Sequence, residues 1–235
     1  MSIHAFPECL PTEIIERAKK LNPALLADGM KGLGIPNDGV MEAAIMPVNP
    51  DPTMTMVGTA VTVETANGDN FPIHVASYMA PAEGYVMVID GKQFPSRAYF
   101  GDLIMGACKA IGYAGMVIDG YTRDRQGCIE MKFPVFSKGQ MQAGPIKKEL
   151  GTINGEIVCG GVIVRPGDLV VGGADGVTVV PQERIEEVLQ KAEEKAAYEE
   201  KRDAAIAAYQ TAKAEGAELP QLAPQWVLDL LAEQT

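Results

Sequence analysis

Arg123 and Asp124 are the two adjacent side chains with the clearest chemical potential in this sequence. They follow the short apolar run Met116–Asp119 and the loop that Gly120 opens. An arginine beside an aspartate on such a loop can bind an anion with one side chain and a cation with the other. On the dipeptide alone, a surface salt bridge is the simpler explanation.

A helix start upstream strengthens the functional interpretation. Gly101, Asp102 and Leu103 open an amphipathic run, so the backbone N–H groups of Leu103 and Ile104 should lie free at the positive end of a helix. Asp102 could serve as the helix N-cap, as a functional group, or as both. We expect a substrate carboxylate to bind between this helix start and Arg123.

The elements that must position these groups are two strands and the helix between them. The pentapeptide MVIDG occurs twice, at Met87–Gly91 and at Met116–Gly120, and apolar residues at i, i+3, i+4 and i+7 predict a helix from Leu103 to Ile111. Two parallel strands joined by a right-handed helical crossover are the economical topology. The loops after both strands would then emerge at one edge, where open α/β sheets bind ligands.

Other polar residues allow a functional and a structural interpretation. Asp90 could belong to the site or could be only a strand-end carboxylate. Lys92 could form a Schiff base, although a loop lysine is usually solvated. His74, on a helix with apolar neighbours, is expected to be a packing residue. Asp168 lies in a glycine-rich turn and is expected to bond nearby backbone N–H groups, as is Asp175.

The rest of the chain alternates short helical and strand patterns. We predict helices over 11–21, 22–31, 72–80, 181–215 and 219–231, and strands over 43–48, 54–65, 85–90, 162–164, 168–171 and 177–180, with small strands between 133 and 160. The 181–215 helix is too polar for burial in its own core but carries an apolar stripe. We therefore expect it to project and contact another subunit of a homotrimer or homohexamer. Residues 1–215 form one predicted α/β domain, and 216–235 a C-terminal extension.

Composition limits the function classes. With 235 residues and 47% apolar content, the chain can bury one sizeable core. No apolar run approaches the roughly 18 residues of a membrane span, and the first residues lack a signal-peptide pattern, so we expect a cytoplasmic protein without a membrane partner. The net charge of −11, from 31 acidic against 20 basic residues, argues against nucleic-acid binding.

Cysteine and histidine usage limits the choice of metal. The four cysteines form no CxxC pair and are expected to be buried thiols. Two histidines are too few for a histidine-rich zinc site and make a Ser-His-Asp triad improbable. A catalytic metal would therefore be a hard, oxygen-ligated ion such as Mg²⁺ or Mn²⁺.

Two long motifs resemble a known family. They are GDLIMGACKAIGYAGMVIDGYTRD, ending at Asp124, and CGGVIVRPGDLVVGGADGVTVVP, ending at Pro181. Over roughly residues 25–200 the chain is similar to the class II pyruvate aldolases acting on 4-hydroxy-4-methyl-2-oxoglutarate and 4-carboxy-4-hydroxy-2-oxoadipate, a family that also includes the regulator of ribonuclease activity A. The resemblance implies a β/β/α swivelling-type fold, a trimer or dimer of trimers, and an active site between subunits.

The resemblance also implies residue roles. Asp124 would hold Mg²⁺ or Mn²⁺, and Arg123 would contact the 2-keto oxygen of a keto acid and stabilise the enolate. The backbone of Gly101, Leu103 and Ile104 would bind the substrate carboxylate, while Asp102 would position a water for proton transfer. A glutamate from the neighbouring subunit's long helix, Glu199 or Glu200, would complete the metal site.

The implied function is therefore cleavage of a 4-hydroxy-2-oxo acid to pyruvate, with oxaloacetate decarboxylation as a side activity. The alternatives are a non-catalytic regulator of the ribonuclease type and a lyase acting on another keto or hydroxy acid. Segments 28–37 and 92–100 depart from the aldolase pattern and leave the exact substrate open. The ribonuclease regulator lacks the carboxylate after the arginine, so Asp124 favours the enzyme.

Overall fold

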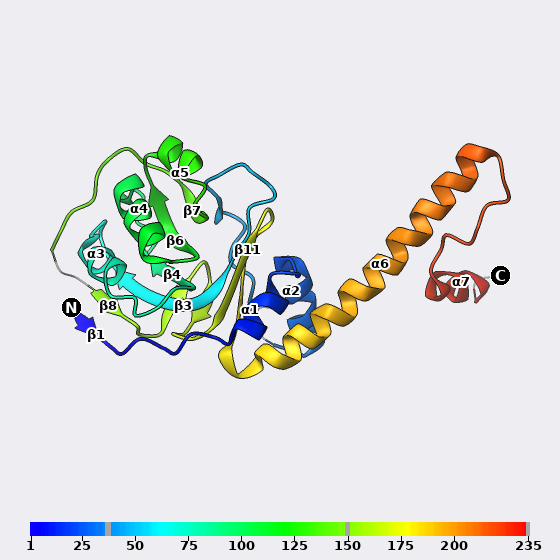
Figure 1. The fold of residues 1–235 in the computed structure, drawn as a ribbon, viewed down its shortest axis with the longest axis horizontal. Coiled ribbons are helices and arrows are strands. Elements are labelled where there is room, and N and C mark those ends of the chain that lie inside the picture. Colours follow the sequence, from blue (N-terminus) through cyan, green and yellow to red (C-terminus); the bar gives the residue numbers. More distant parts are fainter. Residues whose placement is uncertain (36–38, 149–150, 234–235) are drawn as a thin grey trace. The chain divides into compact units, whose positions relative to one another are not determined.

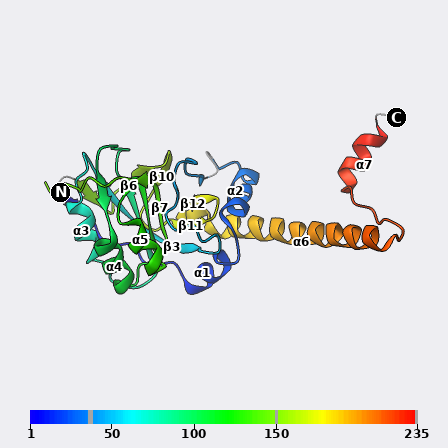
Figure 2. The same ribbon diagram turned by 90° about the horizontal axis from the view of Figure 1, so that it is seen from above.

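The computed structural model describes residues 1–35, 39–148 and 151–233, so the last two residues of the departing segment 28–37 lie outside it. The chain divides into two compact units, Met1–Ala192 and Glu193–Thr235. The first holds the sheet and its layers (Figures 1 and 2). Each unit is described by itself.

The first unit is built on a large mixed sheet. Its main path runs β1 (Ser2–Ile3), β8 (Gly151–Ile153), β3 (Met56–Thr65), β4 (Tyr85–Asp90), β6 (Gly115–Thr122), β7 (Val135–Gln140) and β2 (Met46–Pro47). Beside this path, β5 (Ala98–Phe100) pairs with β6, and β11 (Leu169–Gly173) pairs with β3 and β12 (Gly176–Val180). A small second sheet joins β9 (Ile157–Cys159) to β10 (Val162–Val164). This mixed α/β architecture confirms the predicted fold class.

The predicted crossover unit is present, with the two copies of the repeat side by side. Strands β4 and β6 run parallel, and α4 (Asp102–Ile111) lies between them in sequence. Met87 pairs with Met116, Val88 with Val117 and Ile89 with Ile118, so the repeated pentapeptides lie in register. Because β3, β4, β6 and β7 are mutually parallel, their carboxyl ends share one edge of the sheet.

Both faces of the central strands are covered, as their continuous apolar runs predict. Met87 and Ile89 join the core cluster under the helices, whereas Val86 and Val88 join the cluster under β9 to β12. Figure 1 shows α3 (Phe71–Ser77), α4 and α5 (Arg125–Met131) on one face of the sheet. Helices α1 (Thr12–Ala18) and α2 (Pro23–Gly32) contact β3 and the β11–β12 pair, respectively.

Three predicted elements differ from the structure. The strand expected over 43–48 shrinks to β2, and β6 continues to Thr122, through part of the loop expected between Gly120 and Asp124. Helix α5, which the sequence analysis did not predict, follows Asp124. This helix has seven residues and one buried side chain, Cys128, too short a pattern to read from sequence. The last helix, α7 (Gln225–Ala232), starts later than expected because Pro220 and Pro224 disfavour helix before them.

The long helix α6 (Ile185–Glu215) follows the short 3₁₀ turn Gln182–Arg184. Its buried residues are Ile185, Val188, Leu189 and Ala192, all in the first unit. In the second unit, the Arg202 guanidinium donates to the Leu222 carbonyl at 2.9 Å and ties the linker before α7 to α6. None of the helices in the described ranges is both long and apolar enough to cross a membrane.

Asp168 has the structural role predicted for it. Its carboxylate oxygens accept from the backbone N–H groups of Arg165 at 2.7 Å and Gln182 at 3.0 Å. Burial raises the pKa of Asp168 to about 6, although the two backbone N–H groups act in the opposite direction. The carboxyl group thus joins the turn before β11 to the chain after β12.

This raised pKa predicts a pH-dependent stability difference. The native state holds the proton between about pH 4 and pH 6 whereas the unfolded state loses it, so the contribution of Asp168 falls as pH rises through this window. The unfolding free energy of wild type relative to Asp168→Asn should therefore fall by roughly 2 kcal/mol from pH 4 to pH 7. Urea unfolding of both proteins at each pH measures this difference in unfolding free energy. A difference that grows in favour of wild type as pH rises would contradict the raised pKa of Asp168.

Candidate active site

A cavity of about 380 Å³ opens at the carboxyl ends of the parallel strands, a size typical of small-molecule sites. It is formed by the start of α4, the loop after β6, the start of α3 and the 144–147 loop. The lining residues that sequence predicted are Gly101, Asp102, Leu103, Ile104, Arg123 and Asp124. The structure therefore brings together every predicted site residue of the first unit.

The start of α4 presents free backbone donors to this cavity. The Met105 N–H donates the first intrahelical bond, to the Gly101 carbonyl at 3.1 Å, so the N–H groups of residues 102–104 have no acceptor within the helix. Leu103 is 84% exposed. The helix dipole adds positive potential, so a carboxylate bound here would receive both hydrogen bonds and charge stabilisation.

Of the two roles that the sequence left open for Asp102, the structure does not show the N-cap role. Gly101 occupies the N-cap position in extended conformation, without a side-chain cap, and Asp102 is the first helical residue. A cap side chain must precede the helix in order to reach the next free N–H groups. Asp102 instead lines the cavity as the first residue of α4, at the positive end of the helix.

Asp124 is held in an unusual backbone conformation. Its φ of 58° lies in the left-handed region, which non-glycine residues rarely adopt and which commonly marks functional sites. The preceding Arg123 N–H donates to the Phe100 carbonyl at 3.0 Å and fixes the loop against the end of β5. The turn thereby places both side chains at the cavity.

The two side chains form an ion pair without a hydrogen bond. Arg123 Nε lies 3.3 Å from Asp124 Oδ2, yet among the described residues Nε has no partner in hydrogen-bond geometry. The side chains are 42% and 39% exposed, so solvent screens their attraction. The structure therefore contains the ion pair that the simpler explanation required, and the buried Nε atom has no hydrogen-bond partner among the described residues.

Two glycines make room for this pair. A Cβ atom on Gly101 would overlap the Asp124 carboxylate and would lie 3.0 Å from Arg123 Cγ. A Cβ atom on Gly144 would lie 2.9 Å from Arg123 Nη1. At both positions the backbone approaches the functional side chains so closely that an added Cβ atom would displace them.

Gly101→Ala should therefore impair the site without unfolding the protein. The added methyl group displaces the Asp124 carboxylate, and misplacing a catalytic group by about 1 Å can cost on the order of 10²-fold in rate. Gly106→Ala in the same helix is the matched control, because its Cβ would meet only the end of the Met131 side chain, at 3.8 Å and 3.9 Å, in ordinary van der Waals contact. We expect kcat/KM to fall only for Gly101→Ala. Equal values for the two variants would show that the close approach has no functional role.

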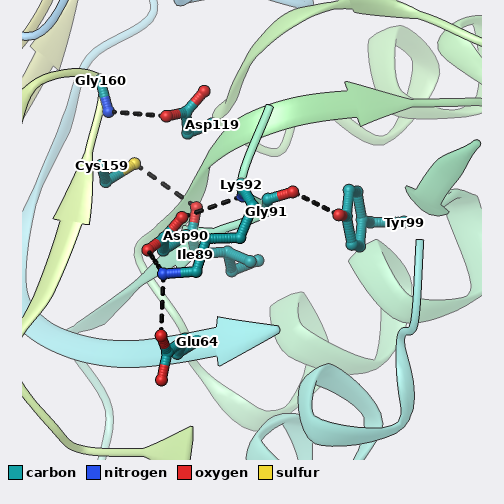
Figure 3. Close-up of polar contacts among 9 residues, drawn as sticks. All are labelled: Glu64, Ile89, Asp90, Gly91, Lys92, Tyr99, Asp119, Cys159 and Gly160. Carbon is teal, nitrogen blue, oxygen red and sulfur yellow. Dashed lines mark hydrogen bonds and ion pairs between the residues drawn. The ribbon is translucent and has the colours of Figure 1, made fainter. Parts of the chain in front are cut away.

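Lys92 is engaged in ion pairs away from the cavity lining (Figure 3). Its Nζ lies 2.5 Å from Asp90 Oδ2 and 2.8 Å from Glu64 Oε1. Burial alone would lower the pKa of Lys92, but the hydrogen bonds that its ammonium group donates to both carboxylates outweigh burial and raise the pKa. A Schiff-base lysine must be neutral to attack, so this environment disfavours that role. Asp90, which is buried, is a strand-end carboxylate.

Asp119, Lys138 and Glu42 form a second cluster of charged side chains. Asp119 accepts from the Gly160 N–H at 3.3 Å, as Figure 3 shows, and its Oδ1 lies 3.0 Å from Lys138 Nζ. Burial raises the pKa of Asp119 although Lys138 opposes the shift. Lys138 also pairs with Glu42 at 2.5 Å. These contacts fasten the β9–β10 hairpin to the sheet, a structural role.

Sequence reasoning missed the three other cavity residues that have polar side chains: Asn70, His74 and Lys147. His74 was expected to be a packing residue, but it lines the cavity half-buried, and burial together with the Lys147 charge lowers its pKa. The topology of the sheet could have revealed these residues. Once β3 is placed parallel to β4, the loop and helix after β3 must emerge at the same edge as Arg123.

The donor set partly fits a hard divalent ion. Among the described residues, no three His, Cys, Asp or Glu side chains gather into a metal site. Mg²⁺ commonly binds through one or two carboxylates and several waters, and the half-exposed Asp124 carboxylate offers such a ligand at an open cavity. Glu199 and Glu200 lie on α6 in the second unit, where Glu199 is 4.0 Å from Lys195. Their part in a metal site stays a prediction.

Comparison with known proteins places the chain in a family. A protein of Halalkalibacterium halodurans, provisionally named 4-hydroxy-4-methyl-2-oxoglutarate aldolase, is 41% identical over 83% of this chain and 89% of its own. An uncharacterised protein from Pseudomonas syringae pv. tomato is 28% identical, with a TM-score of 0.72 over 84% of this chain and 94% of its own. The RNA-processing inhibitor RraA from a Thermus species, 20% identical with a TM-score of 0.55 over 60% of this chain and 84% of its own, shares the fold. Residues 24–179 match the RraA-like family, described as Aldolase/RraA, and the chain belongs to that family.

Proposed function

We propose that this protein is a divalent-metal-dependent pyruvate aldolase that cleaves a 4-hydroxy-2-oxo acid, such as 4-hydroxy-4-methyl-2-oxoglutarate or 4-carboxy-4-hydroxy-2-oxoadipate. The observation that carries the proposal is the meeting of Arg123, Asp124 and the free α4 N-terminus in one cavity. Arginine, a metal-binding carboxylate and a carboxylate-binding helix end are what a 2-oxo acid requires. The aldolase name of the 41% identical relative supports the same reaction class.

The reaction needs charge stabilisation on one oxygen. The 4-hydroxyl group loses its proton, C4 becomes a carbonyl carbon, and the C3–C4 bond breaks. The electron pair of that bond forms the enolate of pyruvate, which is then protonated at C3. Arg123 would donate to the 2-keto oxygen as negative charge develops there. The N–H groups of Leu103 and Ile104 would hold the C1 carboxylate, and Asp102 would orient a water for protonation of C3.

Asp124 would hold Mg²⁺ or Mn²⁺, which would supply Lewis-acid stabilisation of the same developing charge. The predicted glutamate, Glu199 or Glu200 of a neighbouring subunit, would complete the ligand set in a homotrimer or homohexamer. Light scattering tests this assembly, because a protein found only as a 25.0 kDa monomer would remove the intersubunit ligand.

The same site should decarboxylate oxaloacetate, because that reaction passes through the same enolate. The test is a pyruvate-release assay with oxaloacetate and a panel of 4-hydroxy-2-oxo acids, with Mg²⁺ or Mn²⁺ and with EDTA. We expect turnover with metal and none with EDTA. Metal-independent turnover would contradict the proposed mechanism, and no turnover at all would favour a non-catalytic regulator.

A further inference from the structure

Arg97 contacts one wall of the cavity from behind, without lining the cavity itself. Its Nη1 atom donates to the carbonyl group of Gly144, a lining residue, at 2.7 Å. The neighbouring Ala98 N–H donates to the Ala143 carbonyl at 2.8 Å. These two bonds attach the 143–144 segment to the start of β5, the strand that ends one residue before Gly101.

The segment at Gly144 and Pro145 has few groups of its own that could hold its position. Gly144 has no side chain and a large backbone freedom, and Pro145 has no N–H group to donate. The next residue is tied through its backbone, because the Ile146 N–H donates to the Gly68 carbonyl at 2.9 Å. The bond from the Arg97 guanidinium to the Gly144 carbonyl therefore supports the stretch between two backbone ties.

The side chain of Arg97 is itself constrained by the 67–70 turn. A Cβ atom on Gly68 would lie 2.8 Å from Arg97 Cδ and 2.9 Å from Arg97 Cβ, so the arginine stem crosses directly over the Gly68 backbone. Gly68 has a φ of 75°, which also favours glycine at this position. Since Arg97 is half-buried in this contact, its guanidinium reaches Gly144 with little conformational freedom.

The Gly144 backbone in turn lies against the guanidinium group of Arg123. A Cβ atom on Gly144 would lie 2.9 Å from Arg123 Nη1, so Gly144 limits the movement of that group on one side. The other contacts of Arg123 hold it weakly. Its Nε atom has no hydrogen-bond partner among the described residues, and solvent screens its ion pair with Asp124. A donor that stabilises developing charge must be fixed before the reaction, so the position of Gly144 matters for Arg123.

We propose that Arg97 is a positioning residue for the aldolase reaction, because it holds Gly144 in place and thereby keeps the Arg123 guanidinium oriented toward the keto oxygen of the substrate. This inference rests on the proposed function and adds to it a residue outside the cavity, in the segment 92–100 that departs from the aldolase pattern. Since Arg97 does not line the cavity, its substitution should change what Arg123 does and leave metal binding intact.

Arg97→Met keeps an unbranched stem over Gly68 but removes the hydrogen-bond donor. We expect kcat for pyruvate release from 4-hydroxy-4-methyl-2-oxoglutarate to fall about ten-fold. KM and Mn²⁺ affinity should stay within about two-fold of wild type, because Arg123 acts on charge that develops in the transition state. Arg97→Lys keeps a cationic donor on a flexible stem, so its kcat should stay within about three-fold of wild type.

A double-mutant cycle tests whether Arg97 acts through Arg123. The Arg123→Lys variant has already lost the planar guanidinium that Gly144 positions. Adding Arg97→Met to it should therefore lower kcat by less than about two-fold more. A further loss of about ten-fold would show that the two residues act independently, and it would overturn the proposal.

Arg165→Met is the matched control. Arg165 Nε pairs with Glu156 Oε2 at 2.8 Å, both side chains are half exposed, and neither residue lines the cavity. This variant should keep the wild-type kcat. Urea unfolding shows whether each variant is folded, and Arg97→Gln, whose side chain is shorter than that of arginine, replaces Arg97→Met if the latter does not fold.

The outcomes separate this inference from the proposed function. If wild type releases pyruvate, then a wild-type kcat in Arg97→Met, a loss equal to that in Arg165→Met, or a loss of Mn²⁺ binding in Arg97→Met would overturn only the role of Arg97. A wild type that neither releases pyruvate nor exchanges the methyl protons of pyruvate would overturn the proposed function, and the role of Arg97 with it.

Discussion

Asp124→Asn should yield a folded protein that has lost binding of Mg²⁺ and Mn²⁺ and has lost aldol cleavage by about 10³-fold or more. The carboxylate is the metal ligand proposed from this subunit, and Lewis-acid stabilisation of the developing charge is worth several kcal/mol. Asparagine tolerates the left-handed backbone conformation at this position, where φ is 58°, so the turn should persist. Calorimetric titration with Mn²⁺ and a pyruvate-release assay measure the two losses.

Asp124→Gly separates the loss of the ligand from the loss of the fold. Glycine adopts positive φ without steric cost, so this variant should be as stable as wild type or more stable by up to about 1 kcal/mol, while remaining inactive. Urea unfolding gives the stability. Wild-type turnover in either variant would show that Asp124 does not hold a catalytic metal.

Arg123→Lys should bind metal normally yet lose about 10²-fold or more in kcat. Lysine keeps the positive charge but lacks the planar guanidinium, whose several N–H groups can contact the keto oxygen and a carboxylate together. Removing one preorganised oxyanion donor costs on the order of 10²–10³-fold in known enzymes. Mn²⁺ affinity and steady-state kinetics therefore distinguish this variant from Asp124→Asn.

The matched control for Arg123→Lys is Arg125→Lys, two residues further along. The Arg125 Nε donates to the Val48 carbonyl at 3.2 Å, a contact outside the chemistry proposed here. We expect near-normal kcat from it. Equal losses in the two variants would mean that arginine substitutions in this loop act through its structure.

Much of the first unit could be predicted from local pattern. The repeated pentapeptide gave the parallel pair β4 and β6, and the helical spacing between the copies gave α4. Since carboxyl ends of parallel strands share an edge, the meeting of Arg123 with the α4 start followed from topology. These inferences succeed because the spacing of apolar residues and the direction of a strand each depend on many residues.

The missed features depend on single contacts across the chain. In sequence, Asp69 and Asn70 belong to the run NGDN, which is typical of an ordinary turn. Their bonds to the backbone of Ile146 and Lys148 show that this turn faces the 144–147 loop. Lys92 reads as a free loop lysine until Glu64, on another strand, is placed beside it. Whether Asp102 caps α4 depends on the residue at which the helix begins. The sequence pattern locates the first residue of a helix only to within one or two positions.

Metal-dependent exchange of the pyruvate methyl protons tests the central claim most directly, because it requires enolate formation and no knowledge of the distal substrate. Proton NMR of pyruvate in deuterated buffer should show the C3 signal disappearing with wild type and Mg²⁺. The signal should persist with EDTA, and with Asp124→Asn in the presence of Mg²⁺. Exchange that continues unchanged in EDTA, or at the wild-type rate in Asp124→Asn, would contradict a metal-assisted enolate site at Arg123 and Asp124.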